Sequence, residues 1–242
     1  MIAVSIVSHG HGAMVARLMA QLEECPEVGR IILTRNIPEA AACPPDDRVL
    51  LIENAAPKGF GANHNAAFLH CSETFFCVLN PDIELRGNPF PGLLDALVGL
   101  KGSLAAPLIL APDGSVEDSI RFFPTVWSMG RKLLGGHDGR YAVHAGQAPF
   151  APEWVAGMFQ LYRSVDFARL GGFDEAYFLY YEDVDICTRA WRMGMRVIAC
   201  PTASAIHDAQ RDSHRSLRHL RWHLASMARY FLRYWGRLPK AF

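Results

Sequence analysis

Short apolar runs alternate with helical patterns over the first hundred residues. The runs predict strands at 2–7, 30–34, 49–53 and 75–79, and helical spacing of apolar residues predicts a helix over 14–22 and another through 66–69. Strands that alternate with helices in this way predict an α/β fold with one mostly parallel central sheet flanked by helices on both faces. Ligands of such open sheets bind at the carboxyl ends of the strands.

The second half of the chain has a less regular pattern. It predicts strands at 104–110 and 197–200, the latter closed by Pro201, and a strand or a strand pair over 154–163. Helices are predicted at 183–193 and 217–235. Residues 134–152, rich in glycine and proline, are interpreted as a loop and a candidate mobile lid. Because no repeat or linker is evident, we expect a single domain over 1–242, with halves at 1–100 and 101–210 and a C-terminal segment at 211–242.

Composition narrows the classes of function. Of the 242 residues, 50% are hydrophobic and 20% are charged, which is enough apolar material for a sizeable core. The formal net charge is zero, so the whole chain carries no strong field for nucleic acid, and no nucleic-acid partner is expected. The charge is uneven, however, because the chain from Arg211 onward has eight Lys or Arg residues against one acid, Asp212.

Cysteine usage and the N-terminus indicate a cellular compartment. The six cysteines are scattered without a CxxC pair, so neither a thiolate zinc site nor a disulfide framework is expected. The N-terminus has no basic region before its short apolar run, unlike a signal peptide. No apolar stretch approaches the length needed to span a bilayer. We therefore expect a cytoplasmic protein with reduced thiols.

Asp82 directly follows a predicted buried strand, where a carboxylate faces the ligand crevice of an open sheet. One carboxylate together with two phosphate groups of a bound ligand is a normal way to hold Mg²⁺ or Mn²⁺. The alternative is structural, because Asn80-Pro81-Asp82 is favourable turn chemistry by itself.

An acidic cluster of Glu182, Asp183 and Asp185 follows an aromatic run over 177–181. Acids at the start of a helix are favoured by its dipole and by capping, which is the structural interpretation. The functional interpretation is that one carboxylate accepts a proton from a sugar hydroxyl. Aromatic side chains would suit a sugar ring and would raise the pKa of the carboxylate by desolvation.

Two further features are ambiguous by themselves. His207 is either a structural histidine or a further metal contact beside the phosphates. The loop from Lys58 to Asn65 contains two glycines and opens a helix, so its backbone could approach a phosphate or another polar ligand group. A plain capped turn into a helix explains the same residues.

The C-terminal helix also has two interpretations. An apolar stripe runs along one face, and its members are Leu217, Leu220, Leu224, Met227, Phe231 and Trp235. This stripe could pack on the core while the arginines are solvated. Alternatively, the helix lies on a membrane surface, with its arginines toward anionic lipid and four aromatic residues near the interface, namely Trp222, Tyr230, Tyr234 and Trp235.

Taken together, three motifs in a fixed order resemble a known family. GGFDEAYFLYYEDVDICTRAWRMGMRV spans Gly171 to Val197, KGFGANHNAAF spans Lys58 to Phe68, and LNPDIEL spans Leu79 to Leu85. The chain is similar, from Val4 to about Trp235, to the inverting glycosyltransferases of family 2. These enzymes have the GT-A fold, and the resemblance is greatest to the bacterial rhamnosyltransferase-like branch.

The resemblance implies a role for particular residues. It implies that Asp82 and His207 bind the metal, and that Asp183 is the catalytic base beside Glu182. The residues implied to bind the donor are Ser8, His9, Asn54, Gly61, Asn65 and Asn80. Those implied to shape the acceptor side are Trp154, Gly157 and Asp174. Three positions depart from the family pattern. The first loop lacks its aromatic–Asn pair, the second strand ends in Thr34-Arg35 instead of an acid, and the family's D-x-D is reduced to Asn80-Pro81-Asp82.

The resemblance also implies a reaction. A nucleotide-diphosphate sugar, a dTDP- or UDP-sugar such as dTDP-rhamnose, would be the donor, with Mg²⁺ or Mn²⁺ as cofactor. A glycan or lipid-linked acceptor of surface polysaccharide or lipopolysaccharide assembly would receive the sugar at the inner face of the membrane. Two alternatives are a sugar nucleotidyltransferase and a non-catalytic module that binds nucleotide sugars. The former would need a basic phosphate loop after the first strand, and 8–12 contain no Lys or Arg. The Asp82, Asp183 and His207 set argues against the latter.

Overall fold

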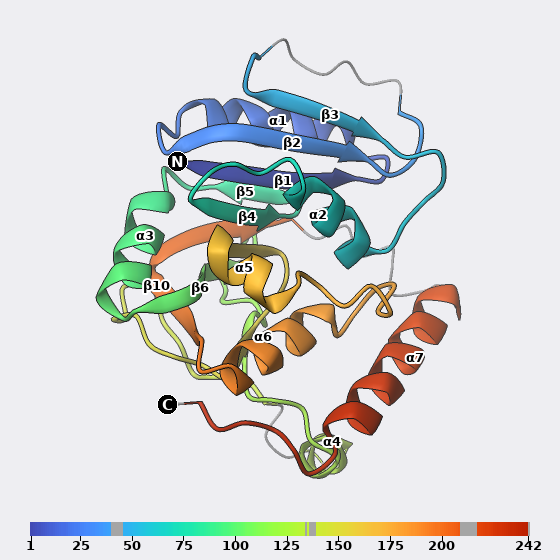
Figure 1. The fold of residues 1–242 in the computed structure, drawn as a ribbon. Helices are drawn as coiled ribbons and strands as arrows, with labels where there is room; N and C mark the ends of the chain where they lie inside the picture. The colour runs from blue at the N-terminus through green and yellow to red at the C-terminus, as the bar shows by residue number, and fades with distance from the viewer. Residues whose placement is uncertain (40–45, 134, 136–138, 209–216, 242) are drawn as a thin grey trace.

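The computed structural model describes residues 1–39, 46–133, 135, 139–208 and 217–241. An eight-stranded sheet has the order β3-β2-β1-β4-β9-β6-β10-β5, and helices cover both of its faces (Figure 1). Its strands are β1 Ile2–Ser8, β2 Val28–Arg35, β3 Val49–Glu53, β4 Phe75–Leu79, β5 Ile83–Leu85, β6 Gly102–Leu110, β9 Phe159–Arg163 and β10 Arg196–His207. A second sheet pairs β7 Ile120–Arg121 with β8 Trp154–Val155.

The helices follow in chain order. They are α1 Gly12–Glu23, α2 Phe60–Phe68, α3 Phe90–Gly99, α4 Val126–Leu133, α5 Ser164–Leu170, α6 Glu182–Arg192 and α7 Leu217–Tyr234. The predicted α/β fold and its main strands and helices are therefore confirmed, and 154–163 forms two strands that belong to different sheets.

Strand direction divides the main sheet into two parallel blocks. β3, β2, β1 and β4 are parallel to one another, and β6 is parallel to β10. Between the blocks lies β9, antiparallel to β4 and β6, and β5 closes the edge antiparallel to β10. The carboxyl ends of β1, β2, β3 and β4 therefore open on one edge, where ligands of such sheets bind.

One predicted strand boundary is wrong. β10 does not stop at Pro201 but continues to His207. The ladder to β6 is interrupted after Cys200 and resumes at Ser204. Because proline has no N–H to donate, the shift in register lets the strand pass Pro201 and carry His207 to its far end.

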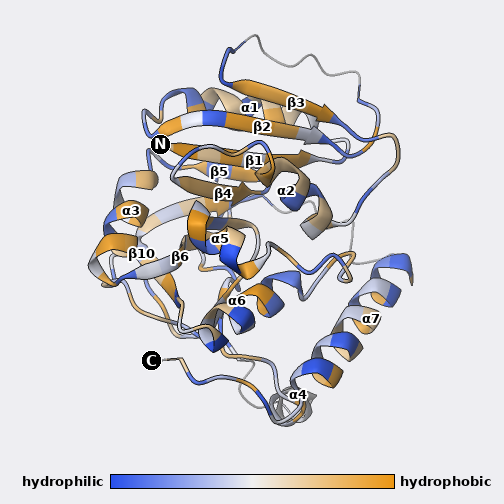
Figure 2. Ribbon diagram, viewed as in Figure 1, coloured by the Kyte–Doolittle hydropathy of each residue, from blue (hydrophilic) through white to orange (hydrophobic). Residues whose placement is uncertain are grey.

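The core lies in two layers, one on each face of the sheet. One layer contains residues of α1 and α3, and the other contains residues of α2, α5, α6 and α7. The strands are predominantly hydrophobic in colour in Figure 2, as expected for a sheet that is covered on both faces.

The packing of α7 differs from the core-facing interpretation of its leucines and from one part of the membrane interpretation, the placement of two tyrosines. The leucine stripe does not pack on the core, since Leu217, Leu220 and Leu224 are exposed. The buried residues are Ser226, Tyr230 and Tyr234, so these two tyrosines cannot lie at a lipid interface. Hydrogen bonds explain the choice of face. The hydroxyls of Ser226, Tyr230 and Tyr234 contact Leu179 O, Thr188 and Asp185, respectively.

Parts of two predicted segments lie outside the described residues. They are residues 211–216 and 242 of the basic C-terminal segment, which include Arg211 and Asp212, and residues 134 and 136–138 of the candidate lid. In the part of the chain that is described, the five cysteines are free thiols. None of the described helices combines the length and the apolar character that crossing a membrane requires.

Candidate active site

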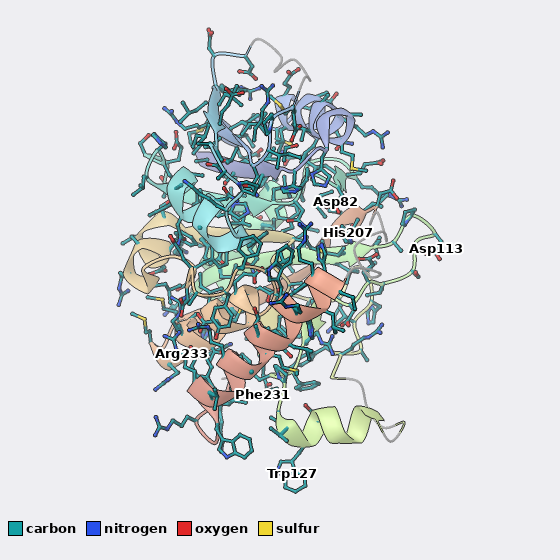
Figure 3. All side chains as sticks on the ribbon, turned by 90° about the vertical axis from the view of Figure 1, so that its right-hand side faces the viewer. Asp82, Asp113, Trp127, His207, Phe231 and Arg233 are labelled. Atoms are coloured by element: carbon teal, nitrogen blue, oxygen red, sulfur yellow. The ribbon has the colours of Figure 1, made fainter. Side chains whose placement is uncertain are left out.

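His207 joins two carboxylates at the end of β10. Its Nε2 lies 3.1 Å from Oδ2 of Asp82, and its Nδ1 lies 2.7 Å from Oε2 of Glu117. Asp82 follows β4, and its backbone carbonyl accepts a hydrogen bond from Asp208 N–H, which holds the two chain segments together. Figure 3 shows Asp82 and His207 side by side. Burial alone would lower the pKa of His207, but the hydrogen bonds and charges of Asp82 and Glu117 raise that pKa to about 9.

This corner of the protein has the chemistry of a cation site. The second carboxylate oxygen of Asp82, Oδ1, is buried and has no hydrogen-bond partner. A buried carboxylate oxygen without a donor is costly unless a cation or another ligand group compensates it. Over the described ranges, no group of three or more His, Cys, Asp or Glu side chains is arranged to hold an ion. The oxygen and nitrogen donors of Asp82 and His207 therefore fit a divalent ion that takes its remaining ligands from a bound phosphate group or from water.

A second carboxylate site lies at the start of α6. Asp183 Oδ2 accepts a hydrogen bond from Gly157 N–H at 3.0 Å, and Oδ1 accepts one from Val184 N–H at 2.8 Å. Burial raises the pKa of Asp183, although these N–H groups and the charge of Arg121 act in the opposite direction. A carboxylate with a raised pKa is a better proton acceptor than an ordinary aspartate.

Glu182 lies beside Asp183 and is a different kind of acid. Its Oε2 is buried without a hydrogen-bond partner. Burial and then the charge of Asp183 raise the pKa of Glu182 well above its ordinary value. Two adjacent carboxylates resist double ionisation. Since the N–H groups of Gly157 and Val184 donate to the Asp183 carboxylate whereas Glu182 Oε2 has no partner, we assign the proton to Glu182 and the charge to Asp183.

The backbone just before α6 has an unusual conformation. Tyr180 and Tyr181 have φ angles of 70° and 66°, in the left-handed region that non-glycine residues rarely adopt. Tyr181 is the N-cap residue of α6, and its side chain makes no capping hydrogen bond. The structure therefore does not support the prediction that Asp183 begins the helix, because Glu182 does. The turn directs both acids into the site at the positive end of the helix.

Asp183 and Glu182 line a pocket of about 300 Å³. We call it the catalytic pocket. Its wall combines aromatic side chains with a cation, and Trp154, Phe122, Tyr181, His223 and Arg121 are among its lining residues. Trp154 is fixed there by the hydrogen bond from its Nε1 to Phe122 O (2.9 Å) and by the guanidinium of Arg121 over its ring. Aromatic walls with a few polar groups are typical of small-molecule sites.

The segment from Val155 to Met158 connects the two carboxylate sites. Met158 O accepts a hydrogen bond from Asn80 N–H, two residues before Asp82. Gly157 donates to Asp183, and Ala156 donates to Ser119 O, two residues after Glu117. The position of Asn80, which was predicted to bind the donor, is therefore set by its backbone hydrogen bond to Met158. Asp183 and the candidate cation site are thus held by one short stretch of chain.

The predicted donor loop lies at the end of β1. Ser8 is buried, and its hydroxyl donates a hydrogen bond to Glu39 at 2.9 Å. Glu39 also accepts the Gly10 N–H at 2.8 Å, while His9 is exposed and its Nδ1 lies 3.4 Å from Asn36 Nδ2. The acid that the family pattern places at the end of the second strand is absent there, but Glu39, four residues beyond the end of β2, supplies a carboxylate beside this loop.

A network of three asparagines joins the ends of β2 and β3 to α2. Asn54 Nδ2 donates to Asn36 Oδ1 at 2.9 Å and to Asn63 Oδ1 at 2.6 Å. Asn36 also accepts Lys58 N–H and donates to Lys58 O. Asn54, which was predicted to bind the sugar donor, is thus held in place by its hydrogen bonds to Asn36 and Asn63.

Gly61 and Asn65 connect α2 to the GGFDE motif. A side chain at Gly61 would place its Cβ 2.6 Å from Phe173 Cβ, so only glycine allows this approach. The Asn65 amide accepts Phe173 N–H and donates to Phe173 O, both at 2.9 Å. Through these contacts the loop from Lys58 to Asn65 and the GGFDE motif position each other.

Known proteins were compared with this chain. No protein-family model matches it. It is 28% identical to rhamnosyltransferase WbbL of Escherichia coli (strain K12), over 96% of this chain and 93% of that protein. It is also 28% identical to N-acetylglucosaminyl-diphospho-decaprenol L-rhamnosyltransferase of Mycobacterium tuberculosis (strain ATCC 25618 / H37Rv), over 84% of this chain and 75% of that one.

Solved structures share the fold at low sequence identity. GalNAc-T7 with UDP, GalNAc and Mn²⁺ superposes with a TM-score of 0.69 at 15% identity, over 88% of this chain and 44% of that one. The mannosyltransferase PcManGT from Pyrobaculum calidifontis, in complex with GDP-Man and Mn²⁺, gives 0.61 at 15% identity, over 94% and 64%. This chain thus spans less than two thirds of either solved chain.

The chain is a GT-A glycosyltransferase. Its sequence relatives include rhamnosyltransferases, and the GT-A fold expected from the resemblance is confirmed.

The acids of the glycosyltransferase's EDVD motif have separate environments. Asp183 lies in the catalytic pocket, whereas Asp185 is fully buried and pairs with Arg189 at 2.7 Å. Arg189 also donates to Leu170 O and Gly172 O, so it fixes the turn before the aromatic run. Asp185 is therefore a structural acid within this motif.

The glycosyltransferase places the three predicted acceptor-side residues differently. Trp154 lines the catalytic pocket, and Gly157 donates a hydrogen bond to Asp183. Asp174 does not line that pocket. Its carboxylate instead pairs with Arg233 of α7. Its role on the acceptor side remains a prediction.

Three residues of the candidate site were not singled out from the sequence, namely Glu117, Glu39 and Arg121. Glu39 and Glu117 come from loops, 31 and 90 residues away from Ser8 and His207, and Arg121 belongs to the short strand β7. The acid-rich stretch after Asp113-Gly114 was a weak signal for Glu117. Nothing in the sequence pattern indicated that His207 would be its partner.

Proposed function

We propose that this glycosyltransferase moves rhamnose, or a related sugar, from a dTDP- or UDP-linked donor to a lipid-linked saccharide, with inversion at the anomeric carbon. The observation that carries the proposal is the position of Asp183. It is a carboxylate of raised pKa in an aromatic pocket, held by Gly157 N–H next to the segment that borders Asp82 and His207.

Asp183 is proposed as the base. The acceptor hydroxyl gives its proton to the Asp183 carboxylate while its oxygen forms a bond to the anomeric carbon. The bond from that carbon to the diphosphate oxygen breaks at the same time, and the diphosphate leaves with the electron pair on the opposite face. A single displacement inverts the configuration, and no covalent enzyme intermediate is needed.

Asp82 and His207 are proposed to hold a divalent cation, Mg²⁺ or Mn²⁺. The ion, when bound, offsets the charge that grows on the leaving diphosphate. Neutral His207 would offer Nε2 to the ion while its Nδ1–H stays bonded to Glu117. Glu117 is therefore proposed as a positioning residue, because a carboxylate on the far ring nitrogen fixes the tautomer and orientation of a metal-binding histidine.

The donor's nucleoside is proposed to bind at the loop after β1. Ser8, His9, Asn54 and Asn80 surround the carboxyl ends of parallel strands there, and Gly61 and Asn65 brace α2 behind them. Glu39 sits where a carboxylate could accept hydrogen bonds from a pyrimidine ring, and its present partners are Ser8 and Gly10.

The acceptor class is inferred from the relatives. One of them is named for N-acetylglucosaminyl-diphospho-decaprenol, a saccharide carried on a polyprenyl diphosphate. An anionic membrane surface is proposed as the place of reaction, because the exposed face of α7 combines Leu217, Leu220 and Leu224 with arginines. Flotation with anionic vesicles tests this part, and absence of binding at low salt would contradict it.

The deciding experiment is a transfer assay. The enzyme is incubated with Mn²⁺, N-acetylglucosaminyl-diphospho-decaprenol and, in separate reactions, dTDP-rhamnose, UDP-glucose and UDP-N-acetylglucosamine. We expect transfer from dTDP-rhamnose and its loss when EDTA removes the ion. Transfer from a UDP-hexose in preference to dTDP-rhamnose would overturn the donor assignment. Failure of every donor would overturn the acceptor assignment.

A further inference from the structure

An apolar groove separates α4 from the C-terminal half of α7. It encloses about 360 Å³. We call it the α4–α7 groove, and its walls include Val126 and Trp127 of α4 with Tyr230, Phe231 and Tyr234 of α7, followed by Trp235. This volume lies within the range of ligand pockets, and the groove is separate from the donor edge of the sheet.

The tyrosines of this groove contribute carbon and not hydroxyl groups. The Tyr234 hydroxyl donates to Asp185 Oδ1 at 2.7 Å, and the Tyr230 hydroxyl lies 3.2 Å from Thr188 Oγ1. Both partners belong to α6, on the core side of α7. Because the polar end of each ring is engaged there, the surface left to the groove is aromatic and aliphatic.

The rim of the groove exposes large apolar side chains. Trp127 is 83% exposed and Trp235 is 68% exposed. Figure 3 shows Trp127 projecting from α4 at the outer edge of the molecule. Exposed tryptophans next to an apolar groove are typical of a surface that receives an apolar ligand.

The groove adjoins the catalytic pocket at Pro124, which lines both of them. Arg121, three residues earlier, lines the catalytic pocket together with Asp183. An acceptor whose hydroxyl reaches Asp183 would therefore have its far end directed along 121–127 toward α4. On this path it meets first the guanidinium of Arg121, which also pairs with Asp118, and then the apolar rings of the groove. That order matches a saccharide followed by a diphosphate and a hydrocarbon chain.

We propose that the α4–α7 groove binds the first isoprene units of a polyprenyl diphosphate acceptor whose saccharide occupies the catalytic pocket. The inference rests on the proposed function for the identity of the acceptor. It assigns α4 and the end of α7 to substrate binding, and makes chain length a determinant of acceptor affinity.

The first test measures binding without turnover. Calorimetry compares geranylgeranyl diphosphate, with twenty carbons, and dimethylallyl diphosphate, with five. We expect the wild-type protein to bind the longer chain at least tenfold more tightly. The exposed pair Trp127→Ala/Trp235→Ala should abolish most of this difference and leave the affinity for the five-carbon compound unchanged. Leu232→Ala is the matched control, because Leu232 is 85% exposed on α7 and does not line the groove.

Several results would overturn the groove assignment. Equal affinity for both chain lengths would do so, as would an equal effect of Leu232→Ala. Loss of binding to phosphatidylglycerol vesicles in the double variant, with unchanged binding of geranylgeranyl diphosphate, would make the surface a membrane contact instead.

A second test separates this inference from the proposed function. Transfer is measured to N-acetylglucosaminyl diphosphates that carry one or four isoprene units. The account expects a KM at least tenfold lower for the longer chain, and a loss of that preference in the double variant. Transfer without chain-length preference would refute the groove alone. Chain-dependent binding of the prenyl diphosphates without transfer to any acceptor would refute the proposed function and support the groove.

Discussion

The backbone N–H of Gly157 donates a hydrogen bond of 3.0 Å to the carboxylate of Asp183. Gly157 also leaves no room for a side chain, since an added Cβ would lie 3.3 Å from Asp183 Cβ and 3.4 Å from the Phe60 ring. We expect Gly157→Ala to displace Asp183 by a few tenths of an ångström and to lower kcat about tenfold, because misplacement of a catalytic group by 1 Å can cost about a hundredfold. Steady-state kinetics check this, with donor affinity as the control. An unchanged kcat would show that this contact does not position the base.

Glu117 provides a test of how His207 is oriented. Glu117→Gln replaces the carboxylate that lies 2.7 Å from His207 Nδ1. Loss of such a partner typically weakens metal binding about 10–100-fold. Calorimetry of Mn²⁺ binding in the presence of dTDP measures this directly.

Glu84→Gln is the matched control for Glu117→Gln. Glu84 lies on β5 opposite Ile206 of β10, and its carboxylate pairs with Arg17 on the surface. We expect its Mn²⁺ affinity to equal that of the wild-type protein. Equal affinities of all three proteins would remove Glu117 from the account.

His64 predicts a pH dependence of stability. It is buried, its Nδ1 lies 2.8 Å from the Ser5 hydroxyl, and burial lowers its pKa from 6.5 to about 3. The unfolded state therefore binds a proton that the native state excludes. The stability contributed by neutral His64 is complete above pH 6.5 and is lost as the pH falls toward 3, by about 1.4 kcal/mol per pH unit.

The measurement is the free energy of urea unfolding of wild-type protein and His64→Gln between pH 7 and pH 5. The difference between the two should shrink as the pH falls, because only the wild-type protein carries this titration. A difference that is constant with pH would show that His64 binds protons equally in the native and unfolded states, so that burial does not lower its pKa.

Tyr234 anchors α7 to α6. Its hydroxyl donates to the buried Asp185, which also pairs with Arg189. We expect Tyr234→Phe to lower the free energy of unfolding by about 1–3 kcal/mol, because it removes a donor from a buried charged acceptor. Tyr230→Phe should cost less, about 1 kcal/mol, because its partner Thr188 still donates to Val184 O. Equal losses in urea unfolding would contradict this difference.

The order of strands and helices could be predicted from the sequence because it rests on local patterns. The run at 49–53 and the run at 75–79 coincide with β3 and β4, and Asn80-Pro81 ends β4 as expected. Strand direction is not local. The antiparallel placement of β9 between β4 and β6 depends on the course of the chain over 111–158, where the pattern is irregular.

The C-terminal helix shows where a local pattern misleads. Its leucines have the spacing of a core-facing stripe, yet the tyrosines face the core. Hydrogen-bond partners on α6, above all the buried Asp185, favour the tyrosine face, and these partners cannot be inferred from the helix alone. The same reasoning explains why Glu117 escaped notice, since its meaning depends on a histidine 90 residues away.

The most direct test of the account is the substitution Asp183→Asn. It keeps the shape of the side chain and removes its capacity to accept a proton. We expect kcat for rhamnose transfer to fall about 10²–10⁴-fold, with the affinity for dTDP and Mn²⁺ unchanged. Glu182→Gln is the matched control and should retain most of the activity, because the raised pKa of Glu182 favours the neutral acid that glutamine resembles. If Asp183→Asn turned over at a rate near that of the wild-type protein, Asp183 would not be the base.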